Sequence, residues 1–566
     1  MTVGLVGSGP AAAAVEAALG DVDVDTVSVE QDAIAEFDLA VVTGQAGDAV
    51  FERANQVALD AGQRWLAVEL GGVGGFPVVD AAVAGFGPDT GCYECLSGRV
   101  SANLDPQAEP TAAPPSHTAR FAGAVAGREA ARALVDDGGL FGRVVEIPHA
   151  SREFLPLPDC ACDDGQTHLP AHTHVERDLE ASLARAERAV DDRLGLIQDV
   201  GEAESFPVPY YLAHSCDTSG FSDVSASRDA AGVAAGWDRA FMKALGEGLE
   251  RYCAGVYRVD EFETAPETAV TDAVSPAVFT CVDDHDPTAQ IEWVRGENLA
   301  TGDPVHLPAE FVYYPPPSRR YCSPVTTGLG LGNGGVEALL AGLYEVIERD
   351  ASMLSWYSTF EPLALEVADE EFQTLVARAD SQGLSVSTLL LTQDVDVPAV
   401  AVAVHRDEWP KFAVGSGADL DVASAARSAL AEALQNWMEL RGMGREDAAD
   451  ATGAIGRYAD LPPEAEAFVE TDGAVPAESV GPDEVPTGED ELEEVLARLD
   501  DADLSAFATR TTTRDVAALG FEAVRAVIPQ AQPLFFHDPV FGERAETVPQ
   551  EMGFEPRLDR EHHPFP

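Results

Sequence analysis

The sequence predicts an α/β protein with a Rossmann-like amino-terminal domain followed by a larger α/β (α+β) domain. Its 566 residues are too many for one hydrophobic core. The chain opens with a buried strand that runs into a glycine turn and a helix, which is typical of a Rossmann-like start. Its character changes after a polar, turn-rich stretch with cysteines and histidines at 156–176. We therefore place the two domains at 1–165 and 176–566.

The first domain is expected to begin with a strand, a helix and two further strands. "TVGLVGSG" at 2–9 is a buried strand with its glycine turn, and "PAAAAVEAAL" at 10–19 is the helix. "VDTVSVE" at 24–30 and "FDLAVVTG" at 37–44 are the next strands. The turn matches G-x-G-x-x-A, with Glu30 closing the second strand, as in dinucleotide-binding proteins. A plain strand–helix turn gives the same pattern, so a nicotinamide-dependent dehydrogenase stays an alternative.

The second domain is expected to begin with a helix at 176–194 and to alternate strands and helices up to about residue 445. Residues 446–490 are acidic and rich in Pro and Gly, which indicates a surface insertion. A helix at 491–503 should follow, and then strands at "AFATRTTT" and "AVRAVIP".

The charge of the chain limits its partners and its compartment. It carries 98 acidic and 35 basic residues, for a formal net charge of −63. Such a surface is typical of a halophilic protein, and it argues against nucleic acid or an anionic membrane as a partner. The opening residues have no basic region of a signal peptide, and no apolar run is long enough to span a membrane. We expect a cytoplasmic protein, whose eight cysteines are thiols or metal ligands rather than disulfides.

A signature, E-x-x-E-R, occurs twice, and a related segment follows it. Residues three and four apart share one face of a helix, so each segment presents its polar side chains together. These side chains are Glu247, Glu250 and Arg251; Glu345, Glu348 and Arg349; and Glu432 with Gln435. Solvated ion pairs on helix surfaces would explain any one segment. Three in an apolar context favour one site, where clustered carboxylates need cations between them. Mg²⁺ meets that need and typically joins carboxylates to nucleotide phosphates, so we predict an ATP site with Mg²⁺.

The segments "KALGEGLERY", "TTGLGLGNGGVEALLAGLYEVIERDA" and "GSGADLDVASAARSALAEALQ" resemble, in this order, the signature segments of YcaO proteins. The resemblance covers about 176–566, and the downstream segments look like the thiazole/oxazole-forming maturase branch. It implies an ATP- and Mg²⁺-dependent cyclodehydratase. A Cys, Ser or Thr side chain of a peptide adds to the preceding carbonyl, the oxyanion is phosphorylated, and phosphate leaves to give a thiazoline or oxazoline.

The resemblance also implies roles for particular residues. The ATP-binding set would be Ser227, Arg228, Glu247, Glu250, Arg251, Glu345, Glu348, Arg349, Glu432 and Gln435, with Glu247, Glu250, Glu345 and Glu348 as Mg²⁺ ligands. Two departures stand out. Ala244 replaces the usual Ser, and "SASRDA" with Ser227 and Arg228 replaces a glycine-lysine turn.

The sequence ends in "HPFP", which as bare sequence is a frayed tail. In azoline-forming YcaO proteins a terminal proline motif is associated with the catalytic centre. By resemblance, Pro564, Pro566 and His563 are therefore candidate catalytic residues, with His562 at the motif's first proline position. His562, His563 or the terminal carboxylate would accept a proton.

The first domain carries two cysteine pairs, Cys92 with Cys95 and Cys160 with Cys162. Four thiolates suit a structural zinc ion, although the C-x-C spacing of Cys160 and Cys162 is shorter than is usual for the second ligand pair. The histidines His168, His172 and His174 are alternative ligands, and plain thiols are the other explanation. "GCYEC" and the glycine-rich start also resemble the cyclodehydratase partner protein, whose fold is like that of ubiquitin-activating enzymes. That partner holds zinc, presents the substrate and usually carries a winged-helix leader-binding module, for which we find no stretch here.

The sequence therefore predicts ATP-dependent cyclodehydration of a ribosomally made peptide, as in the biosynthesis of bacteriocins and other azole-modified peptides. Thioamide formation with external sulfide is the enzymatic alternative, and a non-catalytic nucleotide-binding scaffold is the other. The expected partners are the peptide substrate, a separate leader-binding protein, a flavin azoline dehydrogenase and a second copy of the chain.

Overall fold

The computed structural model describes residues 1–105, 107, 111, 114–135, 139–162, 165, 167–450 and 455–566. Its amino-terminal part is built on one seven-stranded sheet with the order β2-β1-β3-β4-β5-β6-β7. The strands are β1 (Thr2–Val6), β2 (Asp25–Ser28), β3 (Leu39–Gln45), β4 (Trp65–Leu70), β5 (Ala81–Phe86), β6 (Arg143–Ile147) and β7 (Ala150–Glu153). The first four run parallel, and β5, β6 and β7 each pair antiparallel with the strand before them.

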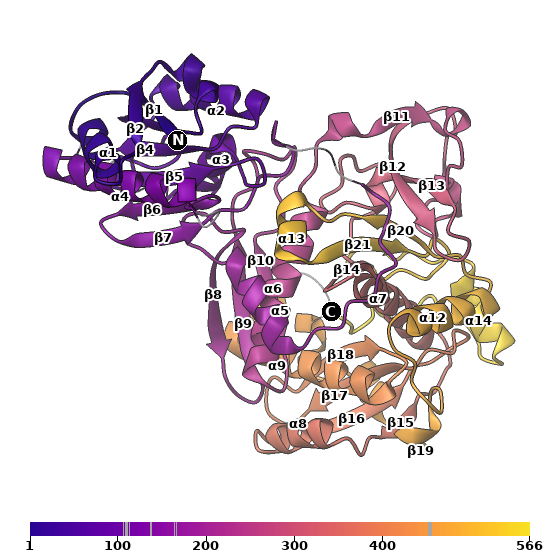
Figure 1. Ribbon diagram of the computed structural model, residues 1–566. Coiled ribbons are helices and arrows are strands. Elements are labelled where there is room, and N and C mark those ends of the chain that lie inside the picture. The colour runs from indigo at the N-terminus through magenta and orange to yellow at the C-terminus, as the bar shows by residue number, and fades with distance from the viewer. Residues whose placement is uncertain are drawn as a thin grey trace.

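Helices cover both faces of this sheet. One face packs against α1 (Pro10–Gly20) and α4 (Ser116–Val135), and the other against α2 (Ala49–Ala61) and α3 (Tyr93–Ala102). Buried Val, Leu and Ala side chains of the strands fill both interfaces, as the unbroken apolar runs of the strand sequences require. Figure 1 shows this unit beside the rest of the chain, with α3 facing the remainder.

Beyond β7, the described residues form three more sheets. The first has the order β10-β9-β8, and the second β11-β12-β20-β21-β14 with β13 beside β12. The third has the order β18-β17-β16-β15-β19. Their bounds are β8 (Ile197–Glu204), β9 (Tyr210–Ser215), β10 (Asp229–Val233), β11 (Glu263–Pro266), β12 (Gln290–Asn298), β13 (Pro304–Pro308), β14 (Leu329–Gly332), β15 (Leu363–Glu366), β16 (Ser385–Leu390), β17 (Ala399–His405), β18 (Phe412–Ala418), β19 (Ala474–Pro476), β20 (Phe507–Arg510) and β21 (Glu522–Val527).

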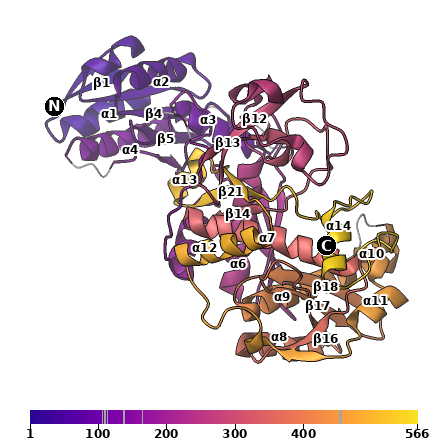
Figure 2. The same ribbon diagram turned by 90° about the vertical axis from the view of Figure 1, so that its right-hand side faces the viewer.

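Three long helices join these sheets. Helix α6 (Trp237–Ala254) packs on β9 and β10, α7 (Gly335–Trp356) lies between β14 and β21 on one side and β17 and β18 on the other, and α9 (Val422–Asp450) covers β17 and β18. Figure 2 shows α7 at the centre of this arrangement. The other helices are α5 (Leu179–Ala186), α8 (Glu370–Asp380), α10 (Ile455–Tyr458), α11 (Pro463–Val469), α12 (Glu489–Asp501), α13 (Arg514–Leu519) and α14 (Arg544–Glu551). The predicted α/β fold class is confirmed.

One prediction is wrong. The expectation that the cysteines form no disulfide fails, because Cys281 and Cys322 are joined, with their Cα atoms 5.8 Å apart. The insertion at 446–490 stays a prediction. Within this segment β19 pairs in parallel with β15, and Tyr458 and Phe468 are buried in the core, although its charge and proline content did not indicate these apolar contacts. Separately, no helix in the described part of the chain is long and apolar enough to cross a membrane.

Candidate active site

The carboxylates of the signature segments meet where α6, α7 and α9 approach one another. On the α7 and α9 side, Ser416 of β18 joins two of them. Its hydroxyl donates to Oε1 of Glu348 at 2.6 Å, and its backbone N–H donates to Oε2 of Glu432 at 2.7 Å. Arg349 lies beside them, with Nε 3.6 Å from Oε1 of Glu348. We call Glu247, Glu250, Glu345, Glu348 and Glu432 the carboxylate cluster.

The α6 side of the cluster is held by backbone donors and one arginine. The N–H of Ala231 on β10 donates to Glu247 at 2.5 Å, and Arg251 pairs with the same carboxylate at 2.5 Å. Glu250 lies close enough to Glu247 and Glu345 for both to affect its pKa. Glu345, on α7, accepts the N–H of Gly328 at 2.9 Å. The two E-x-x-E-R segments therefore form two walls of one cluster, and its role as a metal–nucleotide site stays a prediction.

Glycines allow the helices to approach the strands that hold these donors. A Cβ atom on Gly330 of β14 would lie 2.1 Å from the carbonyl oxygen of Ala338 on α7. A Cβ on Gly342 of α7 would lie 2.6 Å from the carbonyl oxygen of Gly328. Both distances are too short for any side chain, so the run "GLGLGNGG" and Gly342 explain how α7 lies directly against β14. This contact places Glu345 beside Gly328.

Burial and mutual repulsion shape the electrostatics of the cluster. Burial, with Glu345 and Glu247 nearby, raises the pKa of Glu250 to about 8. Burial likewise raises the pKa of Glu432 to about 7, although Arg349 opposes this. The pKa values of Glu247 and Glu348 are also raised, mainly by burial. The protein alone therefore does not neutralise the negative charge that it gathers here.

The cluster fits divalent cations. Carboxylate oxygens are the ligands that Mg²⁺ prefers, and burial raises the pKa values of Glu250 and Glu432, so a bound cation would favour their charged forms. The side chains of Glu247 and Glu345 are each 29% exposed and that of Glu348 is 13% exposed, so a ligand from solvent can reach them. Glu247, Glu250, Glu345 and Glu348 would hold Mg²⁺.

These pKa values predict how stability depends on pH without divalent cations. A carboxyl group whose pKa is raised from 4.5 to about 8 keeps its proton in the folded state while the unfolded chain loses it. The contribution of Glu250 to the free energy of unfolding therefore falls as the pH rises from about 4.5 to about 8. In the Glu250→Gln variant the melting temperature should fall less between pH 6 and 8.5 than in the native protein. Parallel melting curves in the same high-salt buffer would contradict this.

The structure places the remaining predicted ligands differently. Gln435 of α9 donates to Glu439 at 3.0 Å, and Glu439 also accepts the hydroxyl of Tyr210 at 2.8 Å. The guanidinium of Arg228 is exposed and bonded to Ser215 and Gln198. The described contacts of Arg228 thus lie away from the cluster. Ser227, on the same loop before β10, is half-buried.

Two neighbours of the cluster were missed in the sequence. Ser416 is one, and its position directly before "GADLD" in the third signature segment was the available signal. The other is Arg525 of β21, which is buried beside Glu345 and Glu250 and whose pKa burial lowers to about 10. Its guanidinium donates to the carbonyls of Thr326 and Val325 at 2.9 and 3.0 Å. A single arginine in a strand gives no sequence signal of its own.

The tail reaches the cluster through Arg349, whose Nη1 donates to the carbonyl oxygen of Pro566 at 2.9 Å. Phe565 is fully buried and lies edge-on to Phe468. The indole of Trp356 donates to the carbonyl of Glu561 at 2.9 Å. The tail is therefore docked in the core and is not frayed.

His563 is fully buried, and its Nε2 lies 2.6 Å from the carbonyl oxygen of Phe535. Burial and the neighbouring His562 lower its pKa to about 3. A neutral imidazole whose Nε2–H is engaged in the core anchors the tail. Its Nδ1 is buried with no hydrogen-bond partner among the described residues, and its predicted catalytic role stays a prediction. Burial also lowers the pKa of His562, which is half-buried.

Asp350, which follows Arg349 on α7, holds another part of the carboxyl-terminal region. Asp350 accepts two bonds from Arg544 of α14, at 3.1 and 2.7 Å, and the N–H of Gln532 at 2.6 Å. Arg544 also pairs with Asp394. Adjacent residues of α7 thus bind the tail and the segment that leads to it.

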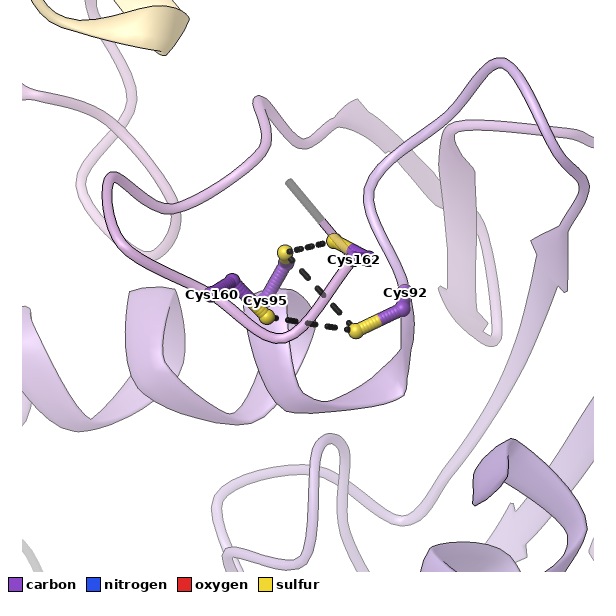
Figure 3. A group of neighbouring side chains, drawn as sticks. All are labelled: Cys92, Cys95, Cys160 and Cys162. Atoms are coloured by element: carbon purple, nitrogen blue, oxygen red, sulfur yellow. Dashed lines mark hydrogen bonds between the residues drawn. The ribbon is translucent and has the colours of Figure 1, made fainter. Parts of the chain in front are cut away.

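The four cysteines come together where the start of α3 meets the loop after β7 (Figure 3). Their sulfur atoms all lie within 4.8 Å of one another, with Cys92–Cys160 and Cys95–Cys162 at 3.5 Å and Cys92–Cys95 at 3.9 Å. A tetrahedral zinc ion with Zn–S bonds of about 2.3 Å separates its sulfurs by about 3.8 Å, so the group fits zinc. In the described part of the chain the three candidate histidines are not members of this group.

Comparisons with known proteins identify the fold. The fold is that of the heterocyclases: a heterocyclase in complex with substrate and cofactor has a TM-score of 0.73 at 21% identity, over 98% of this chain and 83% of that one. The heterocyclase TruD has a TM-score of 0.66 at 19% identity, over 98% of this chain and 82% of its own. YcaO from Methanopyrus kandleri, bound with AMPPCP and Mg²⁺, has a TM-score of 0.52 at 25% identity, over 66% of this chain and 94% of its own.

The family model described as YcaO cyclodehydratase, ATP- and Mg²⁺-binding, matches residues 231–532, which is more than half of the sequence. The chain belongs to the YcaO family, as its signature segments predicted.

Two curated relatives are uncharacterised. One, from Methanothermobacter thermautotrophicus, is 31% identical over 36% of this chain and 56% of its own length. The other, from the tfuA 3′ region of Rhizobium leguminosarum bv. trifolii, is 26% identical over 30% of this chain and 44% of its own length. The matched region thus spans about half the length of these relatives.

Proposed function

We propose that this protein is an ATP- and Mg²⁺-dependent cyclodehydratase that converts Cys, Ser or Thr of a ribosomally made peptide to thiazoline or oxazoline. The observation that carries the proposal is the carboxylate cluster, in which three signature helices gather more negative charge than the protein neutralises. The Methanopyrus relative bound with AMPPCP and Mg²⁺ supports a nucleotide there.

The residues of the cluster have distinct roles in this proposal. Bound Mg²⁺ would offset the charge of the nucleotide phosphates and of the leaving phosphate. Glu247, Glu250, Glu345 and Glu348 hold and orient the ions, and Glu432 fixes the third wall through Ser416. The guanidinium groups of Arg251 and Arg349 present forked donors to phosphate oxygens. Because the protein is so acidic, these arginines and the metal ions are what make an anionic ligand bind.

The tail borders the place where the peptide bond would be activated. Pro564 and Pro566 shape that border, and Arg349 connects Pro566 to the cluster. We assign His563 the role of an anchor rather than a proton acceptor, because its ring is buried and engaged with Phe535.

The surroundings of the enzyme are part of the same proposal. The four cysteines hold a structural zinc ion, and the amino-terminal part presents the substrate, as the partner protein that it resembles does. A homodimer in a salt-rich cytoplasm, a separate leader-binding protein and a flavin dehydrogenase that oxidises the azoline complete the proposed system.

Mass spectrometry tests the reaction. The purified protein in molar KCl is incubated with Mg–ATP and a pool of Cys-, Ser- and Thr-containing peptides, and both water loss and phosphate release are measured. Loss of one water per ring, with phosphate released in step, is expected. Exchange of peptide oxygen for sulfur only when sulfide is added would instead establish thioamide formation. Tight Mg–ATP binding without either product would indicate a scaffold.

A further inference from the structure

Helix α6 runs from the carboxylate cluster directly into the contact with the amino-terminal part of the chain. Tyr252, two residues after Glu250, is fully buried, and its hydroxyl donates to Oδ2 of Asp515 at 2.7 Å. Arg99 of α3 donates to the Tyr252 hydroxyl at 3.3 Å and forms an ion pair with Asp515. All three side chains have 0% relative exposure. We call Arg99, Tyr252 and Asp515 the buried triad.

Each end of the buried triad is tied to the four cysteines. Arg99 lies on α3, the helix that carries Cys95 and begins just after Cys92. Asp515 lies on α13 next to Arg514, whose Nη1 donates to Sγ of Cys162 at 3.1 Å. The cysteine group and Glu250 are therefore connected through two short paths, one along α3 and one along α13.

Further contacts hold the triad in one geometry. Arg99 also donates to the carbonyls of Leu155 and Pro156, at 3.3 and 2.8 Å, just before the second cysteine pair. On α6, Cys253 lies 3.5 Å from the hydroxyl of Thr513, the residue before α13. The side-chain bonds of the triad thus hold together α3, the segment before the second cysteine pair, α6 and α13.

The energetics point to a role beyond stability. Removing a carboxylate and a guanidinium from water costs several kcal/mol for each ion, and a well-packed apolar set of similar volume is often as stable. A fully buried ion pair, however, forms only when the helices that carry its two side chains lie in one relative position. Here that relative position also fixes α6, which carries Glu247 and Glu250.

We propose that Arg99, Tyr252 and Asp515 are positioning residues that couple the cysteine group to the carboxylate cluster, so that zinc bound by the cysteines strengthens Mg–ATP binding. This rests on the proposed nucleotide and zinc sites. Zinc fixes α3 and the 160–162 loop, the triad transmits that position to α6, and Glu247 and Glu250 take the spacing that the metal–nucleotide complex needs. By linkage, Mg–ATP must strengthen zinc binding by the same factor.

The test compares Mg–ATP binding by zinc-loaded and zinc-stripped protein, measured by calorimetry in molar KCl. In the native protein, zinc should strengthen binding about tenfold, within the usual range of coupling between sites. In Tyr252→Phe and Asp515→Asn the ratio should fall to about one, at a temperature where both variants are folded. Arg152→Gln is the matched control, because Arg152 of β7 pairs with Asp191 and Asp192 without contacting α6. It should keep the native ratio.

A second measurement covers the case in which stripped protein unfolds. The affinity for zinc is measured by equilibrium competition with a chelating dye, with and without Mg–ATP. Tighter zinc binding with Mg–ATP is expected in the native protein and in Arg152→Gln, and no difference in Tyr252→Phe. Equal affinities in both zinc states, or a native ratio in Tyr252→Phe, would overturn the coupling alone. Failure of the native protein to bind Mg–ATP in either state would overturn the proposed function, and the coupling with it.

Discussion

Replacing Glu348 by alanine should weaken Mg²⁺-dependent ATP binding by at least about a hundredfold. Glu348 accepts the Ser416 hydroxyl and lies beside Arg349. Its removal takes away a metal ligand and leaves Ser416 and Arg349 without their shared partner. Glu345→Ala should act in the same way. Calorimetric titration of ATP in molar KCl, with and without Mg²⁺, measures the effect.

The control is Asp238→Ala, which removes an exposed carboxylate from the first turn of α6 and should leave binding unchanged. Glu348→Gln separates charge from shape, because an amide still accepts the Ser416 hydroxyl yet is a poor Mg²⁺ ligand. If folded Glu345→Ala and Glu348→Ala bind ATP at full strength, the E-x-x-E-R signature is only an ion-paired helix face. The glycine turn at Gly7 would then become the candidate nucleotide site.

The carboxylate cluster could be predicted because its information is local. Spacings of three and four residues place Glu247 with Glu250, and Glu345 with Glu348, whatever the rest of the chain does. Their meeting across helices needed the resemblance, since one sequence does not show which faces converge. Ser416 and Arg525 were missed because their roles arise only when β18 and β21 lie against α7 and α6. Arg228, predicted to contact ATP, bonds to Ser215 and Gln198 in the described structure, and its role toward the nucleotide stays a prediction.

The segment 446–490 shows the limit of composition as a guide. Its charge and proline content describe its exposed side chains, whereas its fold depends on a few apolar residues such as Tyr458 and Phe468. Tyr458 also donates its hydroxyl to the carbonyl of His562. A segment taken for surface insertion therefore forms part of the dock for the tail. Neither half of this contact is recognisable alone, because about a hundred residues separate the two.

The tail is consequently more than an appended motif. Arg349 lies beside the cluster and binds Pro566, and Asp350, the next residue of α7, binds Arg544. One helical turn of α7 thus organises both the cluster and the segment that leads to the tail. This arrangement predicts that loss of the tail disturbs the chemical step more than nucleotide binding, since the carboxylates keep their own backbone and Ser416 donors.

Deleting Pro564, Phe565 and Pro566 should lower peptide turnover by about a hundredfold or more while Mg–ATP affinity changes less than about threefold. The deletion removes the fully buried Phe565 and the partner of Arg349, so the peptide would lose the border against which its reacting carbonyl is placed. Turnover is measured as water loss from the modified peptide, and affinity by calorimetry. Glu561→Ala is the control, because that exposed side chain pairs with Arg457 outside the cluster. Loss of ATP binding together with turnover would show that the tail supports the nucleotide site itself, and unchanged turnover would show that docking serves stability alone.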